Sequence, residues 1–266
     1  MALHAILAAL MLAGCMTAPP RIPPTEARFD IAAATFSQAA AGGGLPSGWE
    51  PWIIDRRKPA TRYALVDKDE RVVVHAVADA SVSALVRSLL LDPASYPLVR
   101  WRWKAERLIP GADELDAARE DSPARLLIAF AGDADRLDPD ERRKLALASA
   151  FSGREMPYAM LMYVWSNEHP PGSVIANPRS SRVRMVVVEQ GAARVGRWLE
   201  YERDVAVDYR RAFGEEPGSI TAIGVMTDAD DTGATASTYY GDIVFRSAGD
   251  GSASTPARHF WIRWLP

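Results

Sequence analysis

The stretch from Ala222 to Phe245 constrains the fold of this chain most strongly. An apolar run over residues 222–226 precedes an acidic turn, and an alternating run over residues 239–245 follows it. Because strand side chains alternate between two faces, both runs predict β-strands. The turn between them crowds three carboxylates into four residues: Asp228, Asp230 and Asp231. Such charges repel one another unless water, an arginine or a cation compensates them, so we expect a β-structure with one highly charged loop.

Short β-rich segments recur through the rest of the chain and dominate it. They cover residues 28–36, 63–66, 71–78, 84–91, 98–104, 124–130, 158–166, 182–190 and 197–207. The clearest helix starts at Asp138-Pro139, a cap followed by proline at the first helical position, and runs to Phe151. Residues 208–213 predict one or two further helical turns. Since no strand–helix–strand alternation is sustained, the sequence predicts an all-β fold: an antiparallel β-sandwich of jelly-roll type with one inserted helix.

Length and charge limit the domain organisation and the partners. With 266 residues, 48% of them hydrophobic, the chain suffices for one sandwich domain, which we place at residues 28–246, followed by a C-terminal tail over residues 247–266. The formal net charge of -3 provides no basic field. The sequence therefore argues against nucleic acid as a partner.

The N-terminus resembles that of a bacterial lipoprotein. Residues 1–14 form an apolar run that is too short to span a bilayer and ends in small residues, as a signal peptide does. The run closes in Leu12-Ala13-Gly14-Cys15, which resembles a lipobox whose cysteine becomes the lipidated first residue. Cys15 is the only cysteine, so no disulfide competes for it. The alternative is a buried apolar helix with an inert thiol.

The segment after Cys15 fits a spacer between a lipid anchor and a folded domain. Residues 15–27 contain four prolines and predict an extended tether. Met16 follows the cysteine where inner-membrane lipoproteins commonly carry aspartate. The resemblance therefore implies an outer-membrane lipoprotein that faces the periplasm and contacts the membrane through its N-terminal anchor. Outward exposure is the alternative orientation.

Several segments together resemble one bacterial family. They are Trp101–Trp103, Glu120–Arg125, Tyr163–Trp165, Trp198–Val205, Asp208–Tyr209 and Met226–Thr232, and they extend over roughly Trp49 to Phe245. In combination they resemble the domain-of-unknown-function family numbered 3047, a resemblance that implies no established reaction. Separately, the ending Tyr239-x-x-Asp242-Ile-x-Phe245 resembles the last strand of jelly-roll carbohydrate-binding modules, which is an analogy of fold and not of ligand.

The acidic turn also resembles the start of a calcium-binding loop. Asp228, Asp230 and Thr232 occupy alternate positions, and a glycine follows where a sharp bend is needed. Tyr239 stands where an EF-hand supplies its bidentate glutamate, so an EF-hand is excluded. A sandwich can complete the site with Asp242 instead, and the sequence therefore predicts calcium bound by Asp228, Asp230 and Asp242. The alternative is an ordinary turn capped by aspartate side chains.

Aromatic and charged residues in the predicted strands are candidates for a ligand site. Trp101, Trp103 and Trp165 offer flat faces that stack on sugars, although core packing is the commoner role. Asp121, Arg125 and Arg203 lie at or within strands, where an unpaired charge is costly to bury. We expect these six residues to line one ligand-binding cleft. The alternative for the three charges is a closed structural ion-pair network.

Evidence for catalysis is weaker than evidence for binding. The four histidines, His4, His75, His169 and His259, show no metal-ligand spacing, and neither a Gly-x-Ser-x-Gly elbow, a P-loop nor a dinucleotide fingerprint occurs. The first hypothesis is a lipid-anchored envelope protein that binds a saccharide or another polar envelope ligand without turnover. The alternatives are a glycan-cleaving enzyme using paired carboxylates such as Glu200 and Asp121, and a structural or protein-docking lipoprotein.

Overall fold

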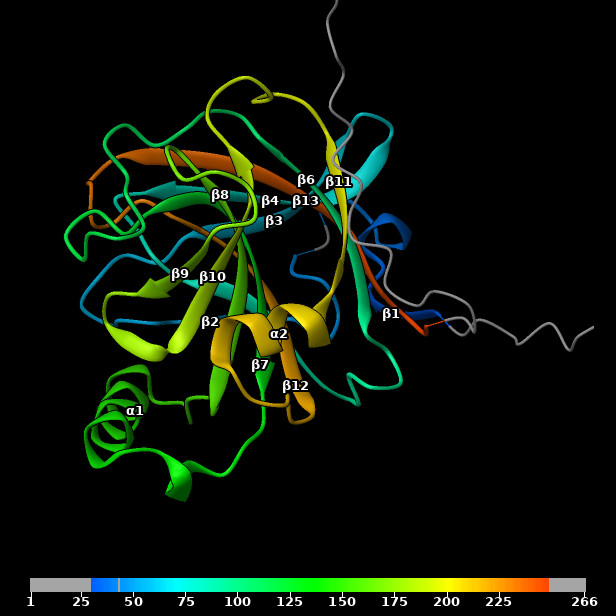
Figure 1. Cartoon of the computed structure of the whole chain (residues 1–266). Coiled ribbons are helices and arrows are strands. Elements are labelled where there is room, and N and C mark those ends of the chain that lie inside the picture. Colours follow the sequence, from blue (N-terminus) through cyan, green and yellow to red (C-terminus); the bar gives the residue numbers. More distant parts are fainter. Residues whose placement is uncertain (1–29, 43, 249–266) are drawn as a thin grey trace, which may run out of the picture.

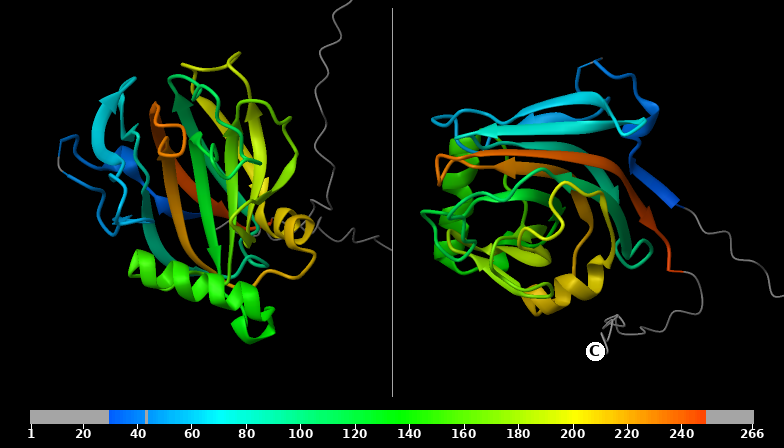
Figure 2. Two further views of the ribbon diagram at one scale, coloured as in Figure 1. Left: turned by 90° about the vertical axis from the view of Figure 1, so that its left-hand side faces the viewer. Right: turned by 90° about the horizontal axis from the view of Figure 1, so that it is seen from above.

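The computed structural model describes residues 30–42 and 44–248, arranged as two sheets that face each other (Figures 1 and 2). The predicted signal peptide, Cys15, the tether and residues 249–266 of the predicted tail lie outside the described residues. Within the described part, neither α-helix is long and apolar enough to cross a membrane. The predicted sandwich is confirmed.

Each sheet draws its strands from distant parts of the chain. One sheet has the order β11-β6-β13-β4-β3, with β1 paired to β13: β1 (Asp30–Ala34), β3 (Arg62–Lys68), β4 (Arg71–Asp79), β6 (Leu98–Ala105), β11 (Leu199–Asp204) and β13 (Thr235–Arg246). The other has the order β2-β5-β12-β7-β8-β10-β9: β2 (Glu50–Trp52), β5 (Ala84–Leu91), β7 (Ser122–Phe130), β8 (Ala159–Ser166), β9 (Val174–Asn177), β10 (Ser180–Gln190) and β12 (Ile220–Asp228). The pairs are antiparallel except β8 with β10, which run parallel.

The acidic turn links the two sheets. β12 lies inside the seven-stranded sheet and β13 inside the six-stranded sheet, so the short segment between them carries the chain from one layer to the other. The two predicted strands flanking this turn are therefore both present, but they do not pair with each other as a hairpin.

The main core lies between the sheets and is built by strand alternation. In β6, Val99, Trp101 and Trp103 face the opposite sheet, while the arginines between them face solvent. Trp101 stacks on Tyr163 of β8 at a ring-centroid distance of 4.9 Å, which ties the layers together. Burial of several such aromatic side chains, each removing about 150–250 Å² from water, supplies much of the energy that holds the sheets together.

The described residues form two α-helices, where the sequence predicted one inserted helix and a short second turn. α1 (Pro139–Ser152) begins as predicted: the Asp138 side chain accepts hydrogen bonds from the N–H groups of Asp140 and Glu141, and Gly153 ends the helix in the left-handed conformation. α2 (Val205–Phe213) begins earlier than expected, because Asp204, the last residue of β11, caps it by accepting from the N–H of Val207. The prediction of strand as far as residue 207 was wrong.

Candidate functional site

The outer face of the seven-stranded sheet, which points away from the main core, is apolar. In β7, Leu126 and Ile128 face the core, while Leu127 faces outward beside Met160 and Met162 of β8. These outward residues form a second buried cluster with Trp52, Val82, Ala84, Val86, Val164, Ile175, Met185, Val187 and Met226. A sheet that carries apolar residues on both faces needs a cover on its outer face as well.

Methionine is concentrated on this face. Of the eight methionines in the sequence, Met1, Met11 and Met16 lie outside the described residues, and the other five, Met156, Met160, Met162, Met185 and Met226, all belong to the second cluster or pack against it. Methionine side chains are flexible and polarisable, so a surface built from them adapts to the shape of what it contacts.

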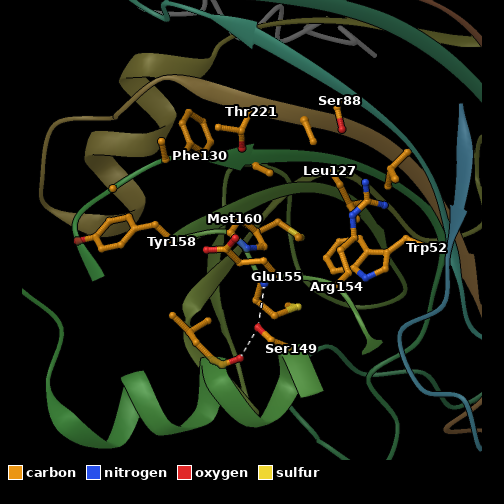
Figure 3. Close-up of a pocket in the computed structure, with 18 of the residues that line it drawn as sticks. Trp52, Ser88, Leu127, Phe130, Ser149, Arg154, Glu155, Tyr158, Met160 and Thr221 are labelled. Atoms are coloured by element: carbon orange, nitrogen blue, oxygen red, sulfur yellow. Dashed lines mark hydrogen bonds between the residues drawn. The ribbon is translucent and has the colours of Figure 1, made fainter. Parts of the chain in front are cut away.

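A groove separates this face from α1 and the segment that follows it (Figure 3). It has two compartments of about 610 Å³ and 350 Å³. They adjoin, because they share the lining residues Trp52, Leu127, Leu145, Met156, Pro157 and Met160, and we call the two together the methionine groove. Sites for small organic ligands typically enclose about 300–1,000 Å³, so the groove is large enough for one.

α1 covers the groove without joining either buried cluster. It is held through Glu141, whose carboxylate accepts from the N–H of Ser181 at 3.3 Å, and through Ser149, whose hydroxyl accepts from the N–H of Met156 at 3.0 Å (Figure 3). Leu145 points to the groove and is half-buried, whereas Leu147 is 52% exposed. Hydrogen bonds therefore position this helix more than apolar packing does, as suits a cover over a site.

One end of the groove is closed by a buried ion-pair network centred on Arg125, which is 1% exposed. Its guanidinium donates to Glu120 Oε1 at 2.7 Å and to the two oxygens of Asp228 at 2.9 and 3.1 Å. Burial opposes the charged guanidinium, but the attraction of Asp228 and Glu120 outweighs this effect and raises the pKa of Arg125. Arg125 therefore stays charged and forms part of the groove wall, and its guanidinium donors are already engaged by protein acceptors.

The acidic turn is compensated by side chains of the same region. Lys58 pairs with Asp230 and Asp231, and Arg179 pairs with Asp231 at 2.7 Å. Asp121 is fully buried and accepts from both the N–H and the hydroxyl of Thr232, at 2.7 and 2.6 Å. Cations and hydrogen-bond donors therefore hold this turn in its observed shape.

The residues predicted to bind calcium are not brought together. Asp228 is occupied by Arg125 and Asp230 by Lys58, while Asp242 lies on β13 of the other sheet and accepts from the N–H of Ser37 at 2.9 Å. Among the described residues, two groups place ligand atoms within 4.8 Å of one another: Asp113, Glu114 and His169, and Asp121, Asp230 and Asp231. The proposed set of Asp228, Asp230 and Asp242 was therefore wrong as a set, and calcium binding by the protein stays a prediction.

The predicted ligand cleft is also not assembled. Trp101, Trp103 and Trp165 lie in the main core with at most 2% of their surface exposed, so none offers a face to a sugar, and core packing is the correct interpretation. Arg203 lies on β11 of the six-stranded sheet, where it pairs with Asp208. Asp121 and Arg125 do lie near the acidic turn, but both are buried and hydrogen-bonded to other protein groups. Each of the three charges has its own structural partner, as low-dielectric burial requires, but they do not pair with one another as the closed-network alternative proposed.

The carboxylate pair considered for glycan cleavage is separated as well. Glu200 is exposed on β11 and pairs with Arg100 on the outer face of the six-stranded sheet, whereas Asp121 is buried beside β7 of the other sheet. Of the described groove-lining acids, Asp55, Glu120, Asp228 and Asp230 are in ion pairs, which leaves Glu155 alone outside them. The described groove therefore does not provide two unpaired carboxylates that could flank a glycosidic bond.

The groove itself was missed by sequence reasoning. A signal was present: residues 124–130 and 159–166 are largely apolar at every position rather than at alternate ones, which is expected when both faces of a strand are covered. In β8, Met160 and Met162 alternate with core residues. Met185 of β10 and Met226 of β12 come to lie on the same face only because their strands pair within this sheet. Pairing across distant segments cannot be obtained from the spacing within one segment.

The protein is thus a two-sheet β-sandwich with one parallel strand pair, and a helix covers the outer face of its seven-stranded sheet. The chain belongs to the family described as Protein of unknown function (DUF3047), whose profile matches residues 47–244. The match confirms the family resemblance of the sequence segments. No curated protein matches the sequence significantly.

Solved structures with a similar course of the chain come from several organisms. A family 29 carbohydrate-binding module from Piromyces equi is 10% identical, with 86% of this chain and 96% of that chain covered and a TM-score of 0.35. A cleaved adhesin domain of Lys-gingipain from Porphyromonas gingivalis is 11% identical (84% and 99% covered, TM-score 0.34). The xyloglucanase domain of a type three effector from Sinorhizobium fredii, in complex with cellobiose, is 11% identical (83% and 99%, TM-score 0.39). Similarity at this level carries no information about a ligand.

Proposed function

We propose that this protein is a lipid-anchored binding protein of the cell envelope and that the methionine groove takes an amphipathic saccharide, a sugar that carries an apolar chain. The observation that carries the proposal is the groove itself: a continuous apolar floor under a helix that belongs to neither buried cluster. Four methionines line the groove, Met156, Met160, Met162 and Met226, and they provide an adaptable surface for a flexible chain, in which burying each methylene group contributes about 0.8 kcal/mol.

Polar groups at the wider compartment are suited to a sugar head group. Ser88 and Thr221 contribute hydroxyls, and Arg154 and Glu155 contribute charged groups at the same compartment (Figure 3). The indole Nε1 of Trp52, which lines both compartments, is buried and has no hydrogen-bond partner within the described residues. An unpaired buried donor costs about 1–3 kcal/mol, and a hydroxyl oxygen of a ligand would relieve that cost.

An apolar chain suits the groove because, apart from Phe151, which is 57% exposed and has the Arg57 guanidinium 5.6 Å from its ring centroid, the groove offers little open aromatic surface. Trp52 is only 8% exposed, and one face of the Tyr158 ring is covered by the Arg182 guanidinium at 4.1 Å from the ring centroid. A bare saccharide that depends on stacking against flat rings would therefore find little of this surface free. The apolar contacts of this groove come mainly from aliphatic and thioether groups, which suit an alkyl or acyl chain.

Attachment to the envelope rests on the sequence. Leu12 to Cys15 resembles a lipobox, and the proline-containing tether over residues 15–27 would hold the sandwich away from the membrane surface. Cys15→Ser should release the protein from the membrane fraction, whereas Ser37→Ala, a change within the folded domain, should leave it there. Membrane fractionation unchanged by Cys15→Ser would refute the anchor.

The binding proposal is tested with matched ligands on the purified full chain. Calorimetric titration with decyl maltoside, maltose and decyl sulfate separates the contributions of sugar and chain. We expect decyl maltoside to bind at least about tenfold more tightly than maltose, because burial of only two methylene groups already provides that factor. Equal affinity for maltose would remove the apolar chain from the proposal, equal affinity for decyl sulfate would remove the sugar, and binding of none of the three would refute it.

A further inference from the structure

A second cluster of chemistry-bearing residues lies outside the methionine groove. The loop over residues 106–121, between β6 and β7, contacts the turn that follows β8, where the Asn167 amide donates to the Ile109 carbonyl at 2.6 Å. Asp113 and Glu114 belong to the loop and His169 to the turn. One ligand atom from each of these three residues lies within 4.8 Å of the others.

The geometry of the cluster suits a bound ion with mixed ligands. His169 Nε2 lies 3.1 Å from Asp113 Oδ1 and 3.9 Å from Glu114 Oε2. The Ser166 hydroxyl donates to Glu114 Oε2 at 2.7 Å and accepts from the N–H of His169 at 3.0 Å, so it orients both residues. Such supporting hydrogen bonds fix the direction of ligands around a metal ion.

An independent observation is the unpartnered oxygen of Glu114. This side chain is 1% exposed, and its Oε1 atom is buried without a hydrogen-bond partner. The Oδ1 atom of Asn167, in the same turn as His169, is also buried and unpartnered. Leaving an acceptor unsatisfied in the interior costs about 1–3 kcal/mol, so native structures rarely keep one without a ligand, an ion or a proton to fill the gap.

The other carboxylate cluster provides the contrast. In the group Asp121, Asp230 and Asp231, each carboxylate has a partner: Thr232 for Asp121, Lys58 for Asp230, and Lys58 with Arg179 for Asp231. Its charge is already compensated, so nothing in that group calls for an ion. In the group of Asp113, Glu114 and His169, Asp113 also pairs with Arg119 at 3.4 Å, but within the described residues the Glu114 carboxylate has no such cation: it bonds to a serine hydroxyl and lies 3.9 Å from a histidine.

We propose that Asp113, Glu114 and His169 bind one divalent transition-metal ion, Zn²⁺ or Mn²⁺. Two carboxylates and one imidazole form a mixed oxygen and nitrogen set, and imidazole favours transition metals over Ca²⁺ and Mg²⁺. Three protein ligands leave at least one position for water or a further group. The ion would join the 106–121 loop to the turn after β8.

The experiment is a metal titration of the purified full chain after treatment with a chelator. Calorimetry with ZnCl₂, MnCl₂ and CaCl₂ is compared for the parent, His169→Ala, Glu114→Gln and the control His75→Ala, which removes an imidazole from the opposite sheet. The parent and His75→Ala should bind Zn²⁺ or Mn²⁺ at a single site and melt at a higher temperature when loaded. His169→Ala should weaken that binding by at least about tenfold, and Glu114→Gln should weaken it similarly.

A spectroscopic measurement keeps the test decisive if a variant fails to fold. The X-ray absorption spectrum of the Zn²⁺-loaded parent should show imidazole nitrogen and oxygen ligands and no sulfur. Zn²⁺ affinity unchanged by His169→Ala and Glu114→Gln would overturn the proposal. So would a parent that binds neither Zn²⁺ nor Mn²⁺ while Glu114→Gln gains stability, because Glu114 would then simply carry a proton. Sulfur ligation, or stabilisation by Ca²⁺ alone, would also count against it.

Discussion

The outer faces of the two sheets follow the same strand alternation yet differ completely in chemistry. On the six-stranded sheet, the outer face carries charged side chains: Arg100 is half exposed and pairs with Glu200, and Lys104, which is 16% exposed, pairs with Asp69. On the seven-stranded sheet, the equivalent positions hold leucine and methionine, and α1 covers them. An antiparallel sheet needs only one apolar face to form a sandwich. The sandwich itself does not require the second apolar face, and this face locates the candidate site.

Charge is also handled differently on the two faces. The Arg100 and Glu200 side chains are each about half exposed, so water screens their attraction. The Arg125 network lies under the groove with almost no exposure, where removal of one partner leaves others buried and uncompensated. Two ion pairs on neighbouring layers thus have very different consequences for stability.

The largest expected effect comes from substituting the buried arginine. Arg125→Met should lower the free energy of unfolding by about 3–5 kcal/mol, because Glu120 and Asp228 would remain buried without their cation. Arg100→Met should lower it by less than about 1 kcal/mol. Urea unfolding of both variants measures the difference. Adding Glu120→Gln and Asp228→Asn to Arg125→Met should recover part of the loss, and equal effects of the two single substitutions would contradict the contrast between the faces.

A smaller effect is expected where α1 is held over the groove. Glu141→Ala removes the carboxylate that accepts from Ser181 and should destabilise the attachment of α1 by about 1–3 kcal/mol. Amide hydrogen exchange should then accelerate in α1 while β7 and β8 keep their protection. Asp140→Ala, on the exposed side of the same helix, is the control. Equal acceleration throughout the seven-stranded sheet would mean that α1 is part of the core and not a separable cover.

The smallest effect concerns pH and the six-stranded face. His75 stacks on Tyr239 at a ring-centroid distance of 4.4 Å, and burial lowers its pKa below the ordinary 6.5; Glu106 opposes this lowering, and Lys68 adds to it by less than Glu106 opposes it. As the pH falls below 6.5, the unfolded chain takes up the proton before the folded protein does, so His75 should reduce stability in this acidic window. His75→Gln should flatten the dependence of melting temperature on pH there. An unchanged slope would show that His75 has the same pKa in both states.

The sandwich was predictable from the sequence because each strand carries its signal within a few consecutive residues. The alternation of Trp101 and Trp103 with arginines is sufficient to place the tryptophans on one face of the strand and the arginines on the other, although it does not show whether the tryptophan face is core or ligand cleft. The cap and proline at the start of α1 are equally local. α2 was partly missed because its cap, Asp204, is also the end of a strand, and a single residue cannot signal which role it takes.

The candidate site was not predictable in the same way because its parts meet only through pairing. Arg125 was a conspicuous charge in an apolar strand, but its partner Asp228 is 103 residues away. The assignment of Trp101, Trp103 and Trp165 to a ligand site failed because the strand pattern cannot tell whether the face that a tryptophan occupies is packed in the core or open to a ligand. Likewise, Asp113 and His169 carry no ligand spacing, since separate loops bring them together.

The central claim, that the methionine groove is the binding site, is tested most directly by two substitutions on one helix. Leu145 lines both compartments, while Leu147 lies two residues away and lines neither. In the full chain, Leu145→Trp should fill the groove and weaken the binding of decyl maltoside at least about tenfold, the equivalent of about 1.4 kcal/mol. Leu147→Trp should leave the affinity unchanged. Equal affinities of the two variants, with both folded as judged by circular dichroism, would place the ligand elsewhere and contradict the account.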